Sequence, residues 1–159
     1  MTVAAILNAA SAQGIMIATA ESCTGGMVAA ALTDVAGSSE VFERGFVTYT
    51  NQAKQDMLGV SVETLDTYGA VSEEVARAMA DGALRNAPVQ LSVAITGIAG
   101  PGGSDFKPEG RVCFALAATG RATVCETVEF GALGRDKVRA AARDHALFLL
   151  QTALAPAGA

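Results

Sequence analysis

A chain of 159 residues can bury one continuous core, and we expect a single domain over residues 1–159. The net charge is −5, from 11 basic and 16 acidic residues, and the basic residues are scattered, which argues against nucleic acid as a partner. No apolar run reaches the roughly 18 residues of a membrane span, and the N-terminus lacks the basic head of a secretory signal, so we expect a cytoplasmic protein with no membrane association.

Cysteine and histidine usage narrows the function classes further. The three cysteines, Cys23, Cys113 and Cys125, have no metal-ligand spacing and cannot all pair, so we expect reduced, mostly buried thiols. The only histidine is His145, which we expect to be a partly exposed helix residue. Most histidine triads and histidine-rich metal sites are therefore excluded, and the sequence predicts neither a metal nor a cofactor.

An amphipathic helix is predicted at the N-terminus, because Val3, Ile6, Leu7 and Ala10 share one helical face. The elements predicted after it are a strand over 15–20, a helix over 27–32, a strand over 46–50, a helix over 51–58 with Asn51 as its N-cap, and a short helix from 61.

The second half of the chain continues the alternation of helices and strands. Its predicted elements are a helix capped by Ser72 that ends near 87, a strand over 89–96, a loop over 97–110, strands over 112–119 and 123–130, and a helix over 136–154. The sequence has no internal repeat and no linker. This order favours the α/β class, as a single-domain α/β/α sandwich with a mixed sheet covered by helices.

A glycine-rich turn over 22–26 follows the first predicted strand and precedes a helix. Ligands of open α/β sheets bind beyond such strand ends, where helix N–H groups face an anion or an oxyanion. Ser22, Cys23 and Thr24 are candidate nucleophiles, each of which needs a base. The alternative is a tight structural turn in which the hydroxyl groups only cap the helix.

Lysine is the remaining candidate base once the lone histidine is set aside. Lys107 falls in the long loop, and Lys137 opens a helix with charged neighbours. Lys54 follows a strand end, in a short helix that would turn its amine back toward Tyr49. The alternatives are a solvated surface lysine and a half-buried strand tyrosine.

A second glycine-rich segment over 97–103 would gather several backbone N–H groups, as in an anion-binding nest, unless it is a simple surface loop. Arg135, just before the last predicted helix, is a candidate phosphate clamp. The residues alone lead to an α/β enzyme with a candidate Ser/Lys site, and they do not identify a substrate.

Motifs along nearly the whole chain match one protein family in content and order. They are the segments 19–26, 36–39, 42–51, 69–72 and 97–103, followed by Lys107, Pro108 and Gly110. With these motifs the chain resembles the CinA C-terminal domain family, the nicotinamide-nucleotide amidohydrolases, in a stand-alone form without the N-terminal nucleotide-processing domain of many relatives. The departures from the family pattern concern loop detail, at Asp105, Phe106, Glu109 and Arg111.

The resemblance implies hydrolysis of nicotinamide mononucleotide to nicotinic acid mononucleotide and ammonia, in pyridine nucleotide recycling. It implies Ser22 as nucleophile and Lys54 as base, assisted by Tyr49. We expect the substrate contacts to come from Glu21, Cys23, Thr24, Gly25, Gly26, Thr96, Gly97, Gly100 and Arg135. The apolar balance of the chain leads us to expect a homo-oligomer, a dimer or larger.

Such a mechanism sets physical conditions. For a lysine to act as base at neutral pH, its pKa must fall from about 10.4 to roughly 7–8, through burial or a nearby positive charge. We expect the N–H groups of 24–26 to hold the oxyanion, and the 97–103 segment or Arg135 to hold the phosphate. The alternatives are Cys23 as nucleophile, another small amide as substrate, or a catalytically silent nucleotide-binding or assembly module of the same fold.

Overall fold

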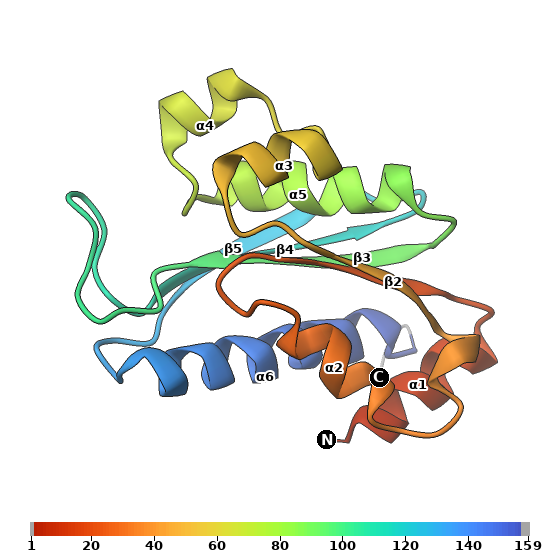
Figure 1. Cartoon of the computed structure of the whole chain (residues 1–159). Helices are drawn as coiled ribbons and strands as arrows, with labels where there is room; N and C mark the ends of the chain where they lie inside the picture. Colours follow the sequence, from red (N-terminus) through yellow and green to blue (C-terminus); the bar gives the residue numbers. More distant parts are fainter. Residues whose placement is uncertain (1, 157–159) are drawn as a thin grey trace.

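Five short, largely apolar segments form one mixed sheet in the computed structural model, which describes residues 2–156 (Figure 1). The strand order is β2-β1-β3-β4-β5. The strands are β1 (Ile17–Glu21), β2 (Phe42–Val47), β3 (Leu91–Gly97), β4 (Arg111–Ala118) and β5 (Val124–Glu129). β1 lies parallel to β2 and β3, whereas β3, β4 and β5 pair in antiparallel fashion. The predicted α/β class with a mixed sheet is confirmed.

Helices cover both faces of this sheet (Figure 1). One face carries α1 (Val3–Ala12), α2 (Met27–Thr33) and α6 (Arg135–Leu154). The other face carries α3 (Asn51–Leu58), α4 (Val62–Tyr68) and α5 (Glu73–Asn86), and a short 3-10 turn, η1 (Ser38–Glu40), precedes β2. Within residues 2–156, no helix combines the length and the apolar character needed to cross a membrane.

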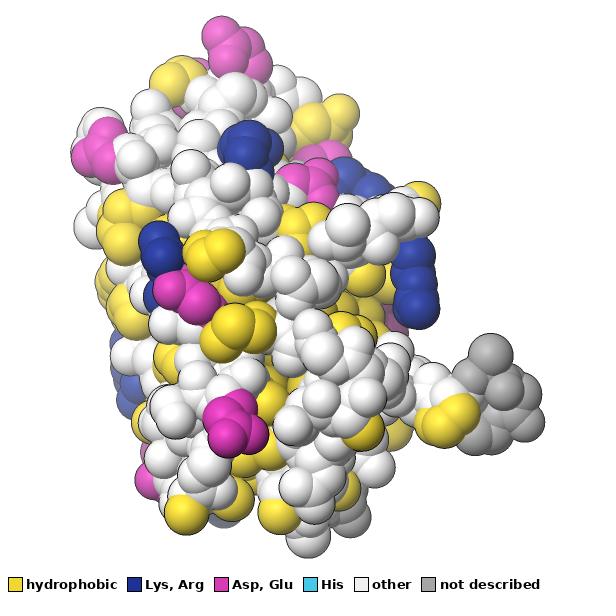
Figure 2. All heavy atoms as spheres, turned by 90° about the vertical axis from the view of Figure 1, so that its right-hand side faces the viewer, with side chains coloured by type: hydrophobic (Ala, Val, Ile, Leu, Met, Phe, Trp, Pro, Cys, Tyr) yellow, Lys and Arg dark blue, Asp and Glu magenta, His cyan; other side chains and the backbone are white. Residues whose placement is uncertain are grey.

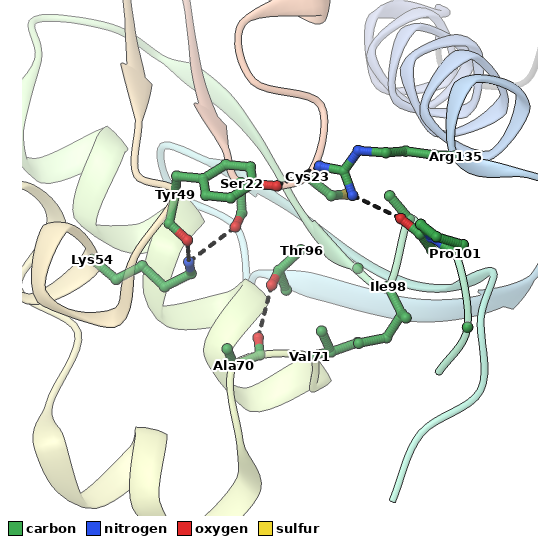
Figure 3. A pocket seen from close by; sticks show the side chains of 14 residues that line it. Ser22, Cys23, Tyr49, Lys54, Ala70, Val71, Thr96, Ile98, Pro101 and Arg135 are labelled. Atoms are coloured by element: carbon green, nitrogen blue, oxygen red, sulfur yellow. Dashed lines mark hydrogen bonds between the residues drawn. The ribbon is translucent and has the colours of Figure 1, made fainter. Parts of the chain in front are cut away.

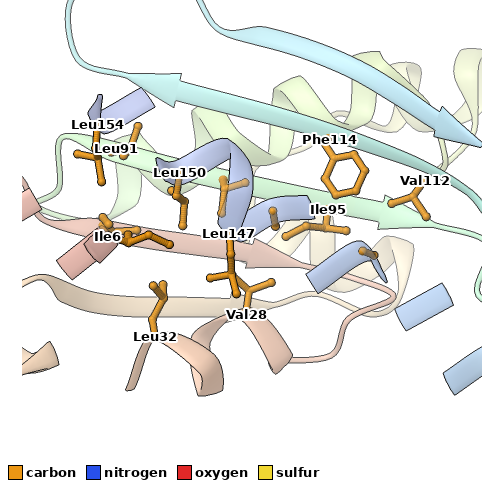
Figure 4. Packing of buried hydrophobic residues seen from close by; sticks show 14 of the residues in the cluster. Ile6, Val28, Leu32, Leu91, Ile95, Val112, Phe114, Leu147, Leu150 and Leu154 are labelled. Atoms are coloured by element: carbon orange, nitrogen blue, oxygen red, sulfur yellow. The ribbon is translucent and has the colours of Figure 1, made fainter. Parts of the chain in front are cut away.

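The core consists of two apolar layers, one on each face of the sheet. Figure 4 shows the layer beneath α1, α2 and α6, where Ile6, Val28 and Leu150 pack with no exposed surface against strand residues such as Phe114. The opposite layer lies between the sheet and α5, with Met79 fully buried. Small alanines on the strands allow these helices to approach closely, which agrees with the low aromatic content of the chain.

The predicted strand over 46–50 is wrong in its bounds. β2 begins four residues earlier, at Phe42, because its register against β1 runs from Ile17 opposite Phe42 to Glu21 opposite Val47. β1 ends at Glu21, whose carbonyl accepts the last hydrogen bond of this pairing, from the Thr48 N–H at 2.8 Å. Thr50, rather than the predicted Asn51, is the N-cap of α3, because its hydroxyl accepts a hydrogen bond from the Ala53 N–H at 3.0 Å.

Charged side chains are dispersed on the face of the molecule that Figure 2 shows. Lysine and arginine side chains there stand singly among acidic and apolar ones rather than in a patch (Figure 2). The view thus agrees with the scattered basic residues of the sequence.

Candidate active site

A cavity of about 290 Å³ opens beyond the carboxyl ends of β1 and β3 (Figure 3). It is lined by Ser22 and Cys23, which follow β1, by Tyr49 and Lys54, and by the start of the 97–103 segment. Parallel neighbouring strands bring their carboxyl ends to the same edge of the sheet, which explains why segments far apart in sequence meet here.

Ser22 and Lys54 form a buried side-chain pair in the cavity. The Ser22 N–H donates to the Ile95 carbonyl at 2.9 Å, which continues the β1–β3 pairing and fixes the serine at the strand end. Lys54 extends from α3, and its Nζ lies 2.9 Å from Ser22 Oγ (Figure 3). Only 1% of Lys54 is exposed, and burial lowers the pKa of its amine from 10.5 to about 8.

The surroundings of the Lys54 amine suit both of its protonation states. Its Nζ lies 2.8 Å from the Thr48 carbonyl and 3.2 Å from the Tyr49 carbonyl, in addition to Ser22 Oγ. The ammonium can donate to all three oxygens. The neutral amine has two hydrogens for the two carbonyls, and its lone pair then faces the Ser22 hydroxyl, which can donate to it.

Tyr49 is connected to this pair through its backbone rather than through its ring. Its hydroxyl accepts a hydrogen bond from Arg135 Nη2 at 2.6 Å, and the other arm of this guanidinium donates to the Gly100 carbonyl at 2.8 Å. Tyr49 is 56% exposed and stands with Arg135 at the mouth of the cavity (Figure 3). The structure therefore does not bring the Tyr49 hydroxyl to Ser22 or Lys54.

Glu21 is turned away from the cavity and into the protein. Its fully buried carboxylate accepts hydrogen bonds from the Thr24 hydroxyl at 2.6 Å and from the N–H groups of Gly26, Val28 and Ala29 at 3.0–3.2 Å. It thereby neutralises the N-terminal end of α2 from within. Glu21, which precedes the turn, does not line the cavity as predicted for substrate contact, because its oxygens are used by the helix.

The expected oxyanion donors of the turn require the same correction. The Gly26 N–H is bonded to Glu21, and the Gly25 N–H donates to the Ser22 carbonyl at 3.0 Å. Neither glycine lines the cavity, nor does the fully buried Thr24 side chain. Among residues 2–156, the N–H groups of Cys23 and Thr24 have no hydrogen-bonded oxygen acceptor. Cys23 lines the cavity, and Thr24 is fully buried next to it.

Cys23 lines the cavity beside the serine but differs from it in reactivity. Burial raises the pKa of its thiol to about 11, so the thiol is neutral at physiological pH. Since the thiolate is the nucleophilic form of cysteine, this environment disfavours attack by Cys23. Cys23, Cys113 and Cys125 are free thiols, of which the first two are buried.

The second glycine segment forms the opposite wall of the cavity. Thr96, Gly97 and Gly100 all line it, and the Thr96 hydroxyl donates to the Ala70 carbonyl at 2.8 Å. Substrate contact by these three residues stays a prediction. Glu109 fixes the segment, because its carboxylate accepts from the Gly102 N–H at 2.6 Å and from the Gly134 N–H at 3.1 Å.

Two long-range contacts of the site have no signal in the sequence. Arg139, on α6, donates to the carbonyls of Cys23 and Thr24, and Glu109 bridges the glycine segment to the start of that helix. The contacts of Glu21 with α2 also have no local signal, because Glu21 ends β1, well before the first residue of that helix.

The lone histidine lies outside the cavity, as a partly exposed residue of α6, as predicted. His145 packs against the Phe114 ring and pairs with Glu126. Within the part of the chain that the structure describes, no three histidine, cysteine or acidic side chains are grouped so that they could hold a metal ion.

Comparison with known proteins identifies a matching protein family. Residues 2–154 match the family model described as the CinA C-terminal domain. A protein of Escherichia coli (strain K12) named nicotinamide-nucleotide amidohydrolase PncC is 54% identical over 141 residues, which cover 88% of this chain and 85% of the relative. The crystal structure of the competence/damage inducible protein CihA from Agrobacterium tumefaciens has a TM-score of 0.92 and 50% identity, covering 96% of this chain and 92% of that one.

Other relatives are much longer than this chain. A CinA-like protein of Syntrophobacter fumaroxidans is 52% identical over 139 residues, but the match covers only 32% of that protein against 87% of this chain. The chain is thus similar both to one domain of longer proteins and to most of the length of shorter ones.

Proposed function

Because the chain belongs to the CinA C-terminal domain family, we propose that it hydrolyses the carboxamide of nicotinamide mononucleotide to nicotinic acid mononucleotide and ammonia. The observation that carries the proposal is the 2.9 Å contact between Lys54 Nζ and Ser22 Oγ inside the cavity. The extensive similarity to a relative named nicotinamide-nucleotide amidohydrolase supports the choice of substrate. We also retain the sequence-based predictions of a cytoplasmic location and a homo-oligomer.

The first half of the reaction is acylation of Ser22. Neutral Lys54 accepts the hydroxyl proton while Ser22 Oγ forms a bond to the carboxamide carbon, and the carbonyl electron pair moves to its oxygen. When this pair returns, the C–N bond breaks and Lys54 gives its proton to the departing nitrogen, which leaves as ammonia. The lowered pKa of Lys54, about 8, suits an acid and a base near neutral pH.

The second half frees the enzyme. A water molecule takes the place of the ammonia, Lys54 removes a proton from it, and the resulting attack breaks the ester bond to Ser22. The Thr48 and Tyr49 carbonyls keep the lysine amine directed at the serine throughout, because they accept its two other hydrogens. Direct contact between the pair makes a relay through the Tyr49 hydroxyl unnecessary.

The remaining contacts of the cavity support roles in binding. The N–H groups of Cys23 and Thr24 replace those of Gly25 and Gly26 as our candidate oxyanion donors. Tyr49 offers a ring at the cavity mouth for the pyridine, and Arg135 offers the positive charge that a phosphate requires. Thr96, Gly97 and Gly100 provide the facing wall, whereas Glu21 builds the turn from inside.

Ammonia release from nicotinamide mononucleotide by the purified protein tests this function, with Ser22→Ala as the control for a contaminating amidase. We expect turnover by the native chain and none by Ser22→Ala, whose fold should be retained because a serine hydroxyl is removed without creating a large cavity. Tight binding of the mononucleotide without ammonia release would instead favour the nucleotide-binding module. Full activity of Ser22→Ala would eliminate the covalent mechanism.

A further inference from the structure

The turn that carries Ser22 is held by an arginine from the opposite end of the chain. Arg139 Nε donates to the Cys23 carbonyl at 3.0 Å, and Nη2 donates to the Thr24 carbonyl at 3.4 Å. The guanidinium is only partly exposed, and a Cβ on Gly25 would lie 3.3 Å from Nη2, so the turn and the arginine fit closely. A planar guanidinium with several fixed donors is suited to hold two carbonyls at once.

The direction of these contacts determines where the opposite ends of the peptide groups point. In a trans peptide the C=O and the following N–H point in opposite directions. The Cys23 carbonyl is directed at Arg139, and α6 lies on one face of the sheet, while α3 with Lys54 lies on the other (Figure 1). The Thr24 N–H therefore points away from α6, toward the side from which Lys54 reaches Ser22.

From this geometry we infer that Arg139 is a positioning residue, which aims and polarises the Thr24 N–H as a donor to the oxyanion formed at Ser22. The inference rests on the proposed function. A cation bonded to one end of a peptide group strengthens the N–H at its other end as a donor. Arg139 is not among the residues that line the cavity, so its effect is confined to the state in which negative charge develops on the carbonyl oxygen.

The test separates oxyanion stabilisation from ordinary binding. Arg139→Gln is compared with Arg143→Gln, which removes the same charge one turn further along α6, where Arg143 pairs with its neighbour Asp144. We expect Arg139→Gln to lower kcat by about 10–100-fold, less than the loss expected when an oxyanion donor is deleted outright, with KM within about twofold. Arg143→Gln should change neither constant.

The affinity for an aldehyde analogue of the substrate distinguishes oxyanion stabilisation from a merely structural role of Arg139. In the mononucleotide of pyridine-3-carbaldehyde, Ser22 Oγ bonds to the aldehyde carbon, the C=O electron pair moves to the oxygen, and the hydroxyl proton moves to Lys54. Arg139→Gln should weaken binding of this analogue by the same 10–100-fold factor as kcat, and leave the affinity for the nicotinic acid mononucleotide product within about twofold. Equal losses for aldehyde and acid, or an unchanged kcat, would overturn the inference.

Two further measurements allow a decision if Arg139→Gln fails to fold or if the proposed substrate is wrong. Arg139→Lys, which preserves a charge and one donor, should recover part of the lost kcat, and it replaces Arg139→Gln if thermal unfolding shows that variant to be unfolded. Acylation of Ser22 by 4-nitrophenyl acetate, followed by mass, needs no nucleotide. If the native chain is acylated but releases no ammonia from nicotinamide mononucleotide, the proposed substrate is wrong, and the inference about Arg139 still stands or falls on the acylation rates of the variants.

Discussion

Each of the two glycine-rich segments of the cavity, 22–26 and 97–103, is hydrogen-bonded to a glutamate carboxylate, and the two carboxylates differ in burial. Glu21 is fully buried and accepts from the Thr24 hydroxyl and the Gly26 N–H of the first segment and from two N–H groups of α2. Glu109 is partly exposed and bonds one N–H of the second segment and one at the start of α6. The first segment is therefore rigidly organised from the interior, whereas the second is tied at the surface.

A glycine-rich segment beside a helix is therefore not by itself an anion site. In both segments, N–H groups that the sequence suggests as donors to a ligand are already bonded to a carboxylate of the protein itself. What remains for chemistry is the small set of groups that the internal anion does not reach, and in the first segment these lie next to Ser22. We assign the reaction to the first segment and substrate selection to the second.

The largest expected effect on kcat comes from replacing Lys54, and replacement of Lys107 provides the comparison. Lys54→Met should lower kcat by about 10³–10⁴-fold, because it removes the base in contact with Ser22. Lys107→Met is the matched variant, since its amine donates to the carbonyls of Tyr68 and Val71 rather than to Ser22. Steady-state ammonia release measures kcat for both variants. Comparable losses in kcat would contradict the assignment of the reaction to the first segment and of substrate selection to the second.

A smaller effect, on stability, is expected from the two carboxylates. Glu21→Gln should lower the free energy of unfolding by about 2–4 kcal/mol, because an amide cannot accept from all the buried N–H groups that surround it. Glu109→Gln should cost less than about 1 kcal/mol, since water can replace its contacts at the surface. Urea unfolding of the two variants makes the comparison, and equal losses would contradict the difference in depth.

Sequence alone could predict most of this site, for physical reasons that individual residues make clear. Ser22 and Lys54 were found because strand ends, short helices and the scarcity of histidine leave few other partners. The engagement of Gly26 by Glu21 was missed, because the same pattern also describes an open helix N-terminus. Arg139 lies 116 residues from the Cys23 carbonyl that it bonds, and no local pattern encodes a contact at that separation.

The pH dependence of the reaction and of stability follows from the burial of Lys54, whose amine contacts Ser22 of the first segment. With a pKa of about 8, roughly one amine in ten is neutral at pH 7, so kcat/KM should rise about tenfold per pH unit below 8 and level off above it. The unfolded chain binds this proton up to about 10.4, so the free energy of unfolding should also rise with pH between 8 and 10.4. Lys54→Met should lose that rise in stability, and a profile centred on 6 would contradict the role of an amine.

The smallest expected effect concerns substrate selection at the second segment. Arg135→Gln should raise KM for nicotinamide mononucleotide by about tenfold and leave the constants for nicotinamide riboside nearly unchanged, because a charged hydrogen bond to phosphate is lost only with the phosphorylated substrate. Lys137→Gln is the control, since it removes an exposed positive charge from the same helix turn. If the native protein hydrolyses the riboside as efficiently as the mononucleotide, no phosphate contact contributes to catalysis, and Arg135 only braces Tyr49 against Gly100.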